Sequence, residues 1–268
     1  MLGMIARPRD YTASVANSTA FQAAFPITNI SNNDYGRVGR LVAAAAGTYQ
    51  LYLDLGANPP PIDAAAILWH NMVAGDTVQV RASSNANVLA NVEYNSGVLA
   101  AITGATNRDV PAPAKFLLTM AAVQTKRYWQ FTFVLATDPG DYIQMSRVLL
   151  LKKAIFAIGA QKADLGADDM NQKIELETGD ERATEDTLLI RPTAALDMRW
   201  AKESEMQEVL GQYTLGLGTS KPMMVVVDLT NPYLQDQIVF GRPDKVMNLQ
   251  SDIYDVWGFQ ASVKSLGP

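Results

Sequence analysis

Short segments in which apolar and polar residues alternate dominate the chain, and the clearest runs from Lys126 to Leu135. Every second position on one side of this segment is a large apolar residue: Trp129, Phe131, Phe133 and Leu135. Gln130 and Thr132 occupy the other side. A period of two residues is typical of a β-strand with one buried face. The sequence therefore predicts a half-buried strand at 126–135.

A turn and a second apolar segment follow this strand. Asp138-Pro139-Gly140-Asp141 has turn chemistry, because proline fixes φ, glycine allows positive φ and aspartate side chains bond nearby backbone amides. Residues 142–151 are apolar enough for another strand. Two such strands need a second sheet against which to bury their apolar faces. We therefore expect 126–151 to be the closing hairpin of a β-sandwich.

More strands are predicted upstream of this hairpin. Apolar and polar residues alternate in 49–55 and in 76–82, and 64–69 is a continuous apolar run. Residues 83–114 are rich in asparagine, glycine and other small residues, and we expect them to be a long surface insertion. Long polar loops at one end of a sandwich often bind ligands.

The second half of the chain begins with a shift in composition. Between Gln161 and Asp186, nine acidic residues face three basic ones, which predicts a solvated linker or extended arm. Strands are expected beyond it at 196–200, 223–228, 237–241 and 257–263. One amphipathic helix is predicted within 204–213, because a capping-box pattern at Ser204-Glu-Met-Gln207 precedes apolar residues at helical spacing.

These patterns predict a mainly β protein in four parts. An N-terminal arm occupies 1–25, and a β-sandwich occupies 26–153. An acidic linker or arm at 154–187 leads to a β-rich (α+β) module at 188–268 with one short helix.

Composition and charge exclude several classes of function. The formal net charge of -5 argues against binding to nucleic acid, because no basic patch is available to neutralise phosphates. The absence of cysteine excludes disulfides, thiolate metal sites and a cysteine nucleophile. The apolar runs are shorter than a bilayer span, so no membrane insertion is expected. The N-terminus lacks the pattern of a signal peptide, which predicts a soluble protein that is not exported by the usual route.

The residues that carry most enzyme chemistry are scarce. His70 is the only histidine, and its place after Trp69 at a strand end predicts a satisfied structural side chain instead of a general base. No Gly-x-Ser-x-Gly motif offers a nucleophile, and zinc would find a single ligand. The carboxylates cluster in the predicted linker, which disfavours a glycosidase. We expect no enzyme, no catalytic residue and no cofactor.

Two kinds of binding site stay open. Oxygen ligands for a structural calcium ion could come from two loops, although no EF-hand spacing supports one and we predict no metal site. The residues concerned are Asn29, Asn32, Asp34, Asp138 and Asp141. Aromatic residues could form a sugar-stacking face, but the core and rim of a sandwich explain them better. These are Tyr35, Trp69, Tyr94, Tyr128 and Tyr142. The candidate contacts for a partner or a glycan are Arg37, Arg40, Asn91, Tyr94 and Asn95.

Several segments resemble galactose-binding-like (discoidin-type) sandwiches. The last strands of that family are similar to Arg127-Tyr-Trp-x-Phe-x-Phe133, to the turn Asp138-Pro-Gly-Asp-Tyr-Ile143 and to Arg147-Val-Leu-Leu150. Pro26-x-x-Asn29-Ile30 matches a segment near the start of such domains. More narrowly, Ile67-Leu-Trp-His-Asn71 and Val78-x-Val-Arg81 resemble the version in minor tail and distal-tail proteins of long-tailed bacteriophages. The resemblance covers about 26–151 and is weaker for 188–265.

The resemblance implies a structural virion protein of a phage tail tip or baseplate, assembled in the host cytoplasm. Such a protein joins the tail tube to the hub as a homo-oligomeric ring or trimer, with the sandwich displayed outward towards a host-surface glycan. The expected contact surfaces are 58–61, 83–114 and 161–186. The alternative is a carbohydrate-binding module without catalytic activity, in which Tyr94 contacts the glycan.

Overall fold

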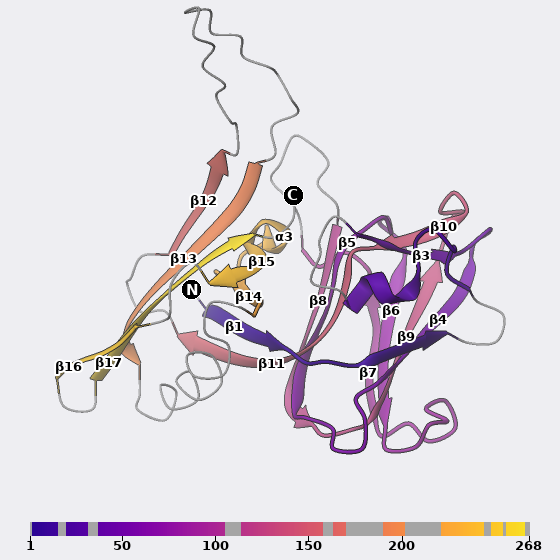
Figure 1. Cartoon of the computed structure of the whole chain (residues 1–268), viewed down its shortest axis with the longest axis horizontal. Coiled ribbons are helices and arrows are strands. Elements are labelled where there is room, and N and C mark those ends of the chain that lie inside the picture. Colours follow the sequence, from indigo (N-terminus) through magenta and orange to yellow (C-terminus); the bar gives the residue numbers. More distant parts are fainter. Residues whose placement is uncertain are drawn as a thin grey trace, which may run out of the picture.

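A computed structural model describes residues 2–15, 20–31, 37–104, 114–157, 163–169, 190–201, 221–243, 248–253 and 256–265 of the 268-residue chain. The fold is mainly β, as the sequence predicts (Figure 1). In these ranges the helical segments are a 3-10 helix, η1 (Ile27–Ser31), and one turn of α-helix, α3 (Leu234–Gln237). The helix predicted within 204–213 lies outside the described residues. No described helix is long and apolar enough to cross a membrane.

One layer of the sandwich is a five-stranded antiparallel sheet. Its order is β2 (Thr12–Val15), β4 (Gly47–Asp54), β9 (Tyr128–Leu135), β6 (Thr77–Ser83) and β7 (Tyr94–Ala100). The central strand β9 places Phe131 opposite Leu51 of β4 and Val80 of β6. All three side chains are fully buried, so this register sets the inner face of the sheet.

The facing layer belongs to a ten-stranded sheet that also contains the C-terminal strands. The sandwich contributes β8 (Ala114–Gln124), β5 (Ile62–His70) and β11 (Arg147–Ala157). The sheet continues through β1 (Leu2–Pro8), β14 (Met223–Val226), β15 (Ile238–Pro243), β17 (Val256–Ser265), β13 (Ile190–Ala201) and β12 (Ala163–Asp169). β16 (Asn248–Ile253) pairs with β17. A two-stranded sheet of β3 (Gly39–Val42) and β10 (Tyr142–Met145) lies beside the sandwich (Figure 1).

Strand β5 is buried along its whole length because it lies between two cores. Ile62, Ala65 and Ile67 belong to the core between the two layers, together with Trp129 and Phe131. The alternate residues of β5 belong to a second core, shared with β1, β14 and β15. That core includes Met4, Ala64, Ala66, Leu68, Met224, Val226, Ile238 and Phe240. Burial on both faces explains why the strand is a continuous apolar run.

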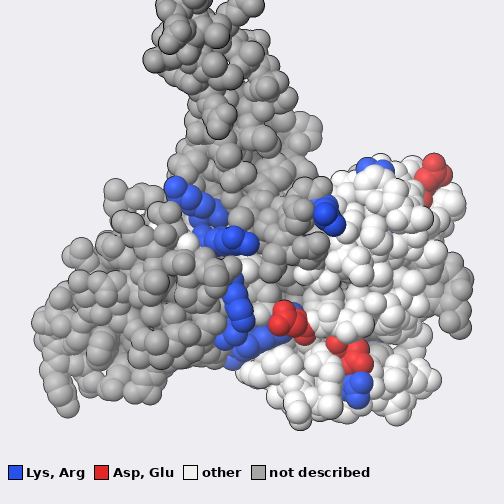
Figure 2. Space-filling view, viewed as in Figure 1, with Lys and Arg blue, Asp and Glu red and all other residues white. Residues whose placement is uncertain are grey.

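Basic side chains gather where the sandwich meets the C-terminal strands, and the sandwich surface on the same side is mostly uncharged (Figure 2). Strand pairing puts Arg7 opposite Lys152 and Arg242 opposite Lys264. Asp63 offsets part of this charge, since its carboxylate lies 2.6 Å from Lys152 Nζ. The charged line therefore marks the joint between the two parts of the molecule.

The predicted N-terminal arm at 1–25 is wrong for residues 2–8, which form β1 in the middle of the ten-stranded sheet. β1 pairs with β11 on one side and with β14 on the other. Residues 12–15 form the edge strand β2. The apolar run before Arg7 is short, so the local pattern does not reveal a strand here. Residues 2–8 form one because they pair with distant segments.

The predicted linker at 154–187 is also a strand in part. Residues 154–157 complete β11, and 163–169 form β12, which pairs with β13. β12 is an edge strand, where charged residues are common, so the acidic composition did not reveal it. Residues 170–187 lie outside the described part, and the positions of the domain boundaries stay predictions.

Residues 126–151 form strands, but they are not a hairpin. β9 pairs with β4 and β6, whereas β11 pairs with β1 and β5 in the opposite layer. The chain therefore crosses between layers through β10, and Phe131 and Val148 belong to the same core. The predicted insertion at 83–114 contains a further strand, β7, whose half-exposed position at a sheet edge leaves little alternation to detect.

Candidate functional site

Three connections lie together at one end of the sandwich: 55–61 between β4 and β5, 84–93 between β6 and β7, and 125–127 between β8 and β9. Strand register requires this arrangement, because Asp54 is opposite Tyr128 and Ala82 is opposite Tyr94. We call this region the loop end.

The short β8–β9 connection holds the loops on either side of it. Arg127 makes a two-pronged ion pair with Asp54, with Nε–Oδ1 and Nη2–Oδ2 distances of 2.7 and 2.8 Å. Lys126 makes an ion pair with Glu93 at the end of the β6–β7 loop. Two-pronged arginine–carboxylate pairs fix geometry as well as charge. The Arg127 guanidinium also lies 4.7 Å from the centre of the Tyr128 ring.

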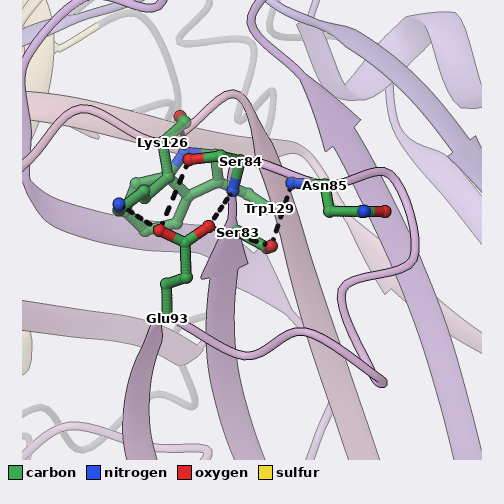
Figure 3. A network of polar contacts seen from close by, with 6 residues as sticks. All are labelled: Ser83, Ser84, Asn85, Glu93, Lys126 and Trp129. Carbon is green, nitrogen blue, oxygen red and sulfur yellow. Dashed lines mark hydrogen bonds and ion pairs between the residues drawn. The ribbon is translucent and has the colours of Figure 1, made fainter.

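Glu93 is the centre of a polar network in the β6–β7 loop (Figure 3). Its carboxylate accepts hydrogen bonds from the Ser84 backbone N–H at 2.6 Å, from the Ser83 hydroxyl at 3.3 Å and from Lys126. The hydrogen bonds from Lys126, the largest cause, and from Ser84 lower the pKa of Glu93 to about 2. The hydrogen bonds of Arg127 likewise lower the pKa of Asp54. Both carboxylates therefore stay ionised at neutral pH.

The asparagines of this loop mainly hold its own backbone. Asn87 N donates to Asn85 Oδ1 at 3.0 Å, and Asn91 Nδ2 donates to the Asn87 carbonyl at 3.1 Å. Asn95, in β7, accepts from Gln79 Nε2 at 2.8 Å and from Gly97 N at 2.9 Å. Asn91 and Asn95, two of the predicted contact residues, thus already make hydrogen bonds within the protein.

Tyr94 lies at the rim of the core beside this loop. Its ring is half-buried, 6.0 Å from the Trp129 ring with an interplanar angle of 49°. Burial raises the pKa of its hydroxyl. Trp129 is fully buried, and its indole N–H donates to the Lys126 carbonyl at 2.9 Å. Tyr94 therefore lies beside the buried ring of Trp129, and it follows Glu93, the partner of Lys126, directly in the sequence.

Arg37 and Arg40, also predicted as contacts, lie elsewhere. The Arg40 guanidinium is 3.8 Å from the centre of the Phe25 ring and 4.4 Å from that of Tyr142, and its Nε donates to Gln144 at 3.0 Å. Arg37 is exposed just before β3. β3 and β10 lie at the opposite end of the sandwich, where β5 finishes. The five predicted contacts therefore form two separate groups.

The sequence did not reveal the two ion pairs of the loop end. Glu93 and Lys126 are 33 residues apart, and Asp54 and Arg127 are 73 residues apart. Neither separation carries a local signal, and only the strand register brings the partners together.

The other sequence candidates lie away from this end. His70 is 2% exposed, and burial lowers its pKa to about 4. Neither of its ring nitrogens has a hydrogen-bond partner among the described residues, so the prediction of a satisfied side chain is wrong. Asn29 Nδ2 donates to the Val38 carbonyl at 2.9 Å, and Asp138 caps its own turn at Gly140 N. Asn32 and Asp34 fall outside the described residues. In the described ranges, no group of three or more His, Cys, Asp or Glu could hold a metal ion.

Comparison with known proteins finds similarity to solved structures and no match by sequence. No protein-family model matches the sequence, and no curated protein matches it. The chain is similar to a family 32 carbohydrate-binding module of NanJ from Clostridium perfringens in complex with galactose, at 13% identity and a TM-score of 0.40, over 56% of this chain and 99% of that one. It is similar to chitosan-binding module 1 of a chitosanase/glucanase from Paenibacillus sp. IK-5, at 10% identity and a TM-score of 0.37, over 54% and 96%.

A GH29 fucosidase from Ruminococcus gnavus shows 12% identity and a TM-score of 0.39, over 53% of this chain and 25% of that one. Likeness this distant establishes neither a family nor a ligand for the chain. It gives no support to a phage-tail function. What the structure itself defines is a mainly β protein with a two-layer sandwich and an ordered, polar loop end.

Proposed function

We propose that this protein binds carbohydrate without catalysis and that the glycan lies at the loop end. The observation that carries the proposal is the pair of ion pairs, Glu93–Lys126 and Asp54–Arg127, held beside the half-buried rings of Tyr94 and Tyr128. Carboxylates accept hydrogen bonds from sugar hydroxyls, cations donate to them, and aromatic rings stack on the apolar face of a pyranose. Groups already fixed in place bind with a smaller entropic cost.

The same contacts support binding without hydrolysis. A glycosidase needs a carboxylic acid with a raised pKa to protonate the leaving group. At the loop end the pKa values of Asp54 and Glu93 are lowered, because each carboxylate is paired with a cation. Both are therefore suited to accept hydrogen bonds and unsuited to donate a proton.

A glycan array tests the proposal, using oligosaccharides that end in galactose, glucosamine or mannuronate. We expect the wild-type protein to bind at least one of them and Tyr94→Ala to weaken that binding by tenfold or more. Tyr142→Ala is the matched control, because Tyr142 is a half-buried tyrosine at the opposite end. Absence of wild-type binding, or an equal loss in the Tyr142 variant, would contradict the proposal. Thermal melts of both variants verify folding.

We propose a structural role in a phage tail tip as a second function, compatible with the first. The observation that favours it is the continuous ten-stranded sheet, which holds the loop end in a fixed position relative to the C-terminal strands. Such a joint suits a protein that displays a binding surface from an assembly. Light scattering and negative-stain images test it: a closed ring or trimer, alone or with a tail-tube protein, supports the role, and a monomer under both conditions contradicts it.

A further inference from the structure

The outer face of the five-stranded sheet is mostly polar over its three central strands. The inward residues of β4, β9 and β6 belong to the core, so the alternate residues face away from it. Six of these outward residues form what we call the polar sheet face: Gln50, Tyr52, Gln79, Arg81, Gln130 and Thr132. Val134 of β9 is an exposed apolar residue on the same side. The polar sheet face lies on the flat of the sheet and not among the loops, and none of its residues is a contact predicted above.

Strand register arranges the polar sheet face in two rows. Tyr52, Gln130 and Arg81 lie side by side in the first row, and Gln50, Thr132 and Gln79 lie in the second. Ser14 of β2 and Asn95 of β7 extend the first row to the sheet edges. Strands are spaced by about 4.8 Å, so five strands give a row about 19 Å long. A row of this length spans several sugar units.

The unpaired polar atoms at the middle of the polar sheet face are the main reason to assign it a ligand. The side chains of Gln130 and Thr132 are 0% and 6% exposed. Gln130 Oε1 and Thr132 Oγ1 have no hydrogen-bond partner among the described residues. Buried polar atoms are normally paired, because leaving one unpaired costs about 1–3 kcal/mol. Both side chains alternate with the core residues of β9, so they lie on the outer side of the sheet, beneath the neighbouring side chains of the polar sheet face.

The residues around them are held in place by one another. Gln130 Nε2 donates to the Tyr52 hydroxyl at 3.0 Å, which in turn donates to Gln50 Oε1 at 2.9 Å. On the other side Arg81 Nη2 donates to Gln79 Oε1 at 2.5 Å, and Gln79 donates to Asn95. The face is thus a fixed array of amides and hydroxyls with a single cation.

We propose that the polar sheet face is a second glycan-binding surface, which takes an extended polysaccharide lying across the strands. This inference rests on the proposed function in that both ligands are carbohydrates, but it uses different residues. Amides and hydroxyls match the hydroxyls of sugars. A single arginine is too little charge for a nucleic-acid strand.

Affinity electrophoresis in gels that contain galactan, glycol chitosan or alginate tests the proposal, together with titration calorimetry of the matching short oligosaccharides. The variants are Tyr52→Ala with Arg81→Ala on the face, Tyr94→Ala at the loop end, and Thr48→Ala as a control. Thr48 is exposed on the same side of β4 but outside both rows. We expect one polysaccharide to retard the wild-type protein. The double variant should lose tenfold or more of that affinity and keep its binding of short sugars, with the Thr48 variant unchanged.

Thr132→Val gives a second measurement that does not depend on surface truncation. Valine has nearly the shape of threonine and removes only the hydroxyl, so the thermal midpoint should hold or rise while polysaccharide affinity falls. Unchanged retardation of the double variant overturns the inference. A wild-type protein that binds short sugars but no polysaccharide also overturns it, and in that case the proposed function at the loop end survives. Loss of polysaccharide binding through Tyr94→Ala alone also overturns it. If the wild type binds no carbohydrate, both proposals fail.

Discussion

Lowering the pH below 6.5 should destabilise the protein through His70. The side chain is 2% exposed, and burial lowers its pKa from 6.5 to about 4. Between these two values the unfolded chain binds a proton that the folded chain does not. Stability therefore rises with pH across this window, is fully present above pH 6.5 and is lost as the pH falls towards 4.

The expected loss is large compared with typical stabilities. The two pKa values, 6.5 and about 4, differ by about 2.5, and each pKa unit is worth about 1.36 kcal/mol. The loss relative to neutral pH is thus roughly 1 kcal/mol at pH 5.5 and roughly 2–3 kcal/mol at pH 4.5 and below. Small domains have total stabilities of about 5–15 kcal/mol, so urea denaturation resolves such changes.

Urea denaturation of the wild type and of His70→Gln at pH 7.5, 5.5 and 4.5 measures this contribution. Carboxylates titrate in both proteins, so the difference between them isolates the histidine. That difference should change by roughly 2–3 kcal/mol between pH 7.5 and 4.5, in the direction that favours the variant at low pH. Because the chain has one histidine, NMR titration of its imidazole gives an independent value. A difference that does not vary with pH, or an NMR pKa near 6.5, would refute the reasoning.

Three further predictions concern the joint and the loop end. Gly241→Ala should destabilise the protein by more than about 2 kcal/mol in urea, because a Cβ there would lie 1.8 Å from the Lys264 carbonyl oxygen. Gly47→Ala, whose nearest neighbour would be 3.8 Å away, should have little effect, and equal midpoints for the two variants would contradict this. Lys115→Met should lower the thermal midpoint by several degrees and speed amide exchange in β15. The reason is that buried Lys115 Nζ donates to the carbonyls of Gln235 at 2.8 Å and Ile238 at 2.9 Å. An unchanged midpoint would show that these hydrogen bonds add no net stability. Glu93→Gln should speed amide exchange at Ser84. The pKa of Glu93 is lowered from 4.5 to about 2, so its contribution to stability is present above pH 4.5 and is lost as the pH falls through 2. At that pH the exchange rates of the wild type and the variant should converge.

The sequence predicted the strands that have one apolar and one polar face. It missed the strands that are recognised only by their pairing with distant segments. Alternation located β4, β6 and β9, and the uninterrupted apolar run located β5. β1, β7 and β12 have no such pattern; β7 and β12 lie at sheet edges, and pairing alone makes all three strands. The order of strands in the sheets was equally hidden. Turn chemistry at 138–141 was recognised, but nothing local shows that the turn joins two layers instead of two neighbours.

The candidate site was predicted in part. Asn91, Tyr94 and Asn95 do lie together at the loop end, because they are close in sequence. Arg37 and Arg40 do not join them, since β3 belongs to a separate small sheet at the opposite end. The outward residues Gln130 and Thr132 were visible as the polar side of a strand, yet their row neighbours in β4 and β6 follow only from register.

The position of β1 has a consequence for how the chain folds. Met4 is opposite Ile155 on one side and Val226 on the other, so β1 leaves the ribosome long before its partner strands are synthesised. Pairings this distant in sequence raise the contact order and slow the search for the native topology. Until residue 226 has emerged, the apolar edge of β1 is open to neighbouring chains and invites aggregation. Once β14 docks, the early and late halves of the polypeptide are joined at one seam, and we expect them to melt in a single transition.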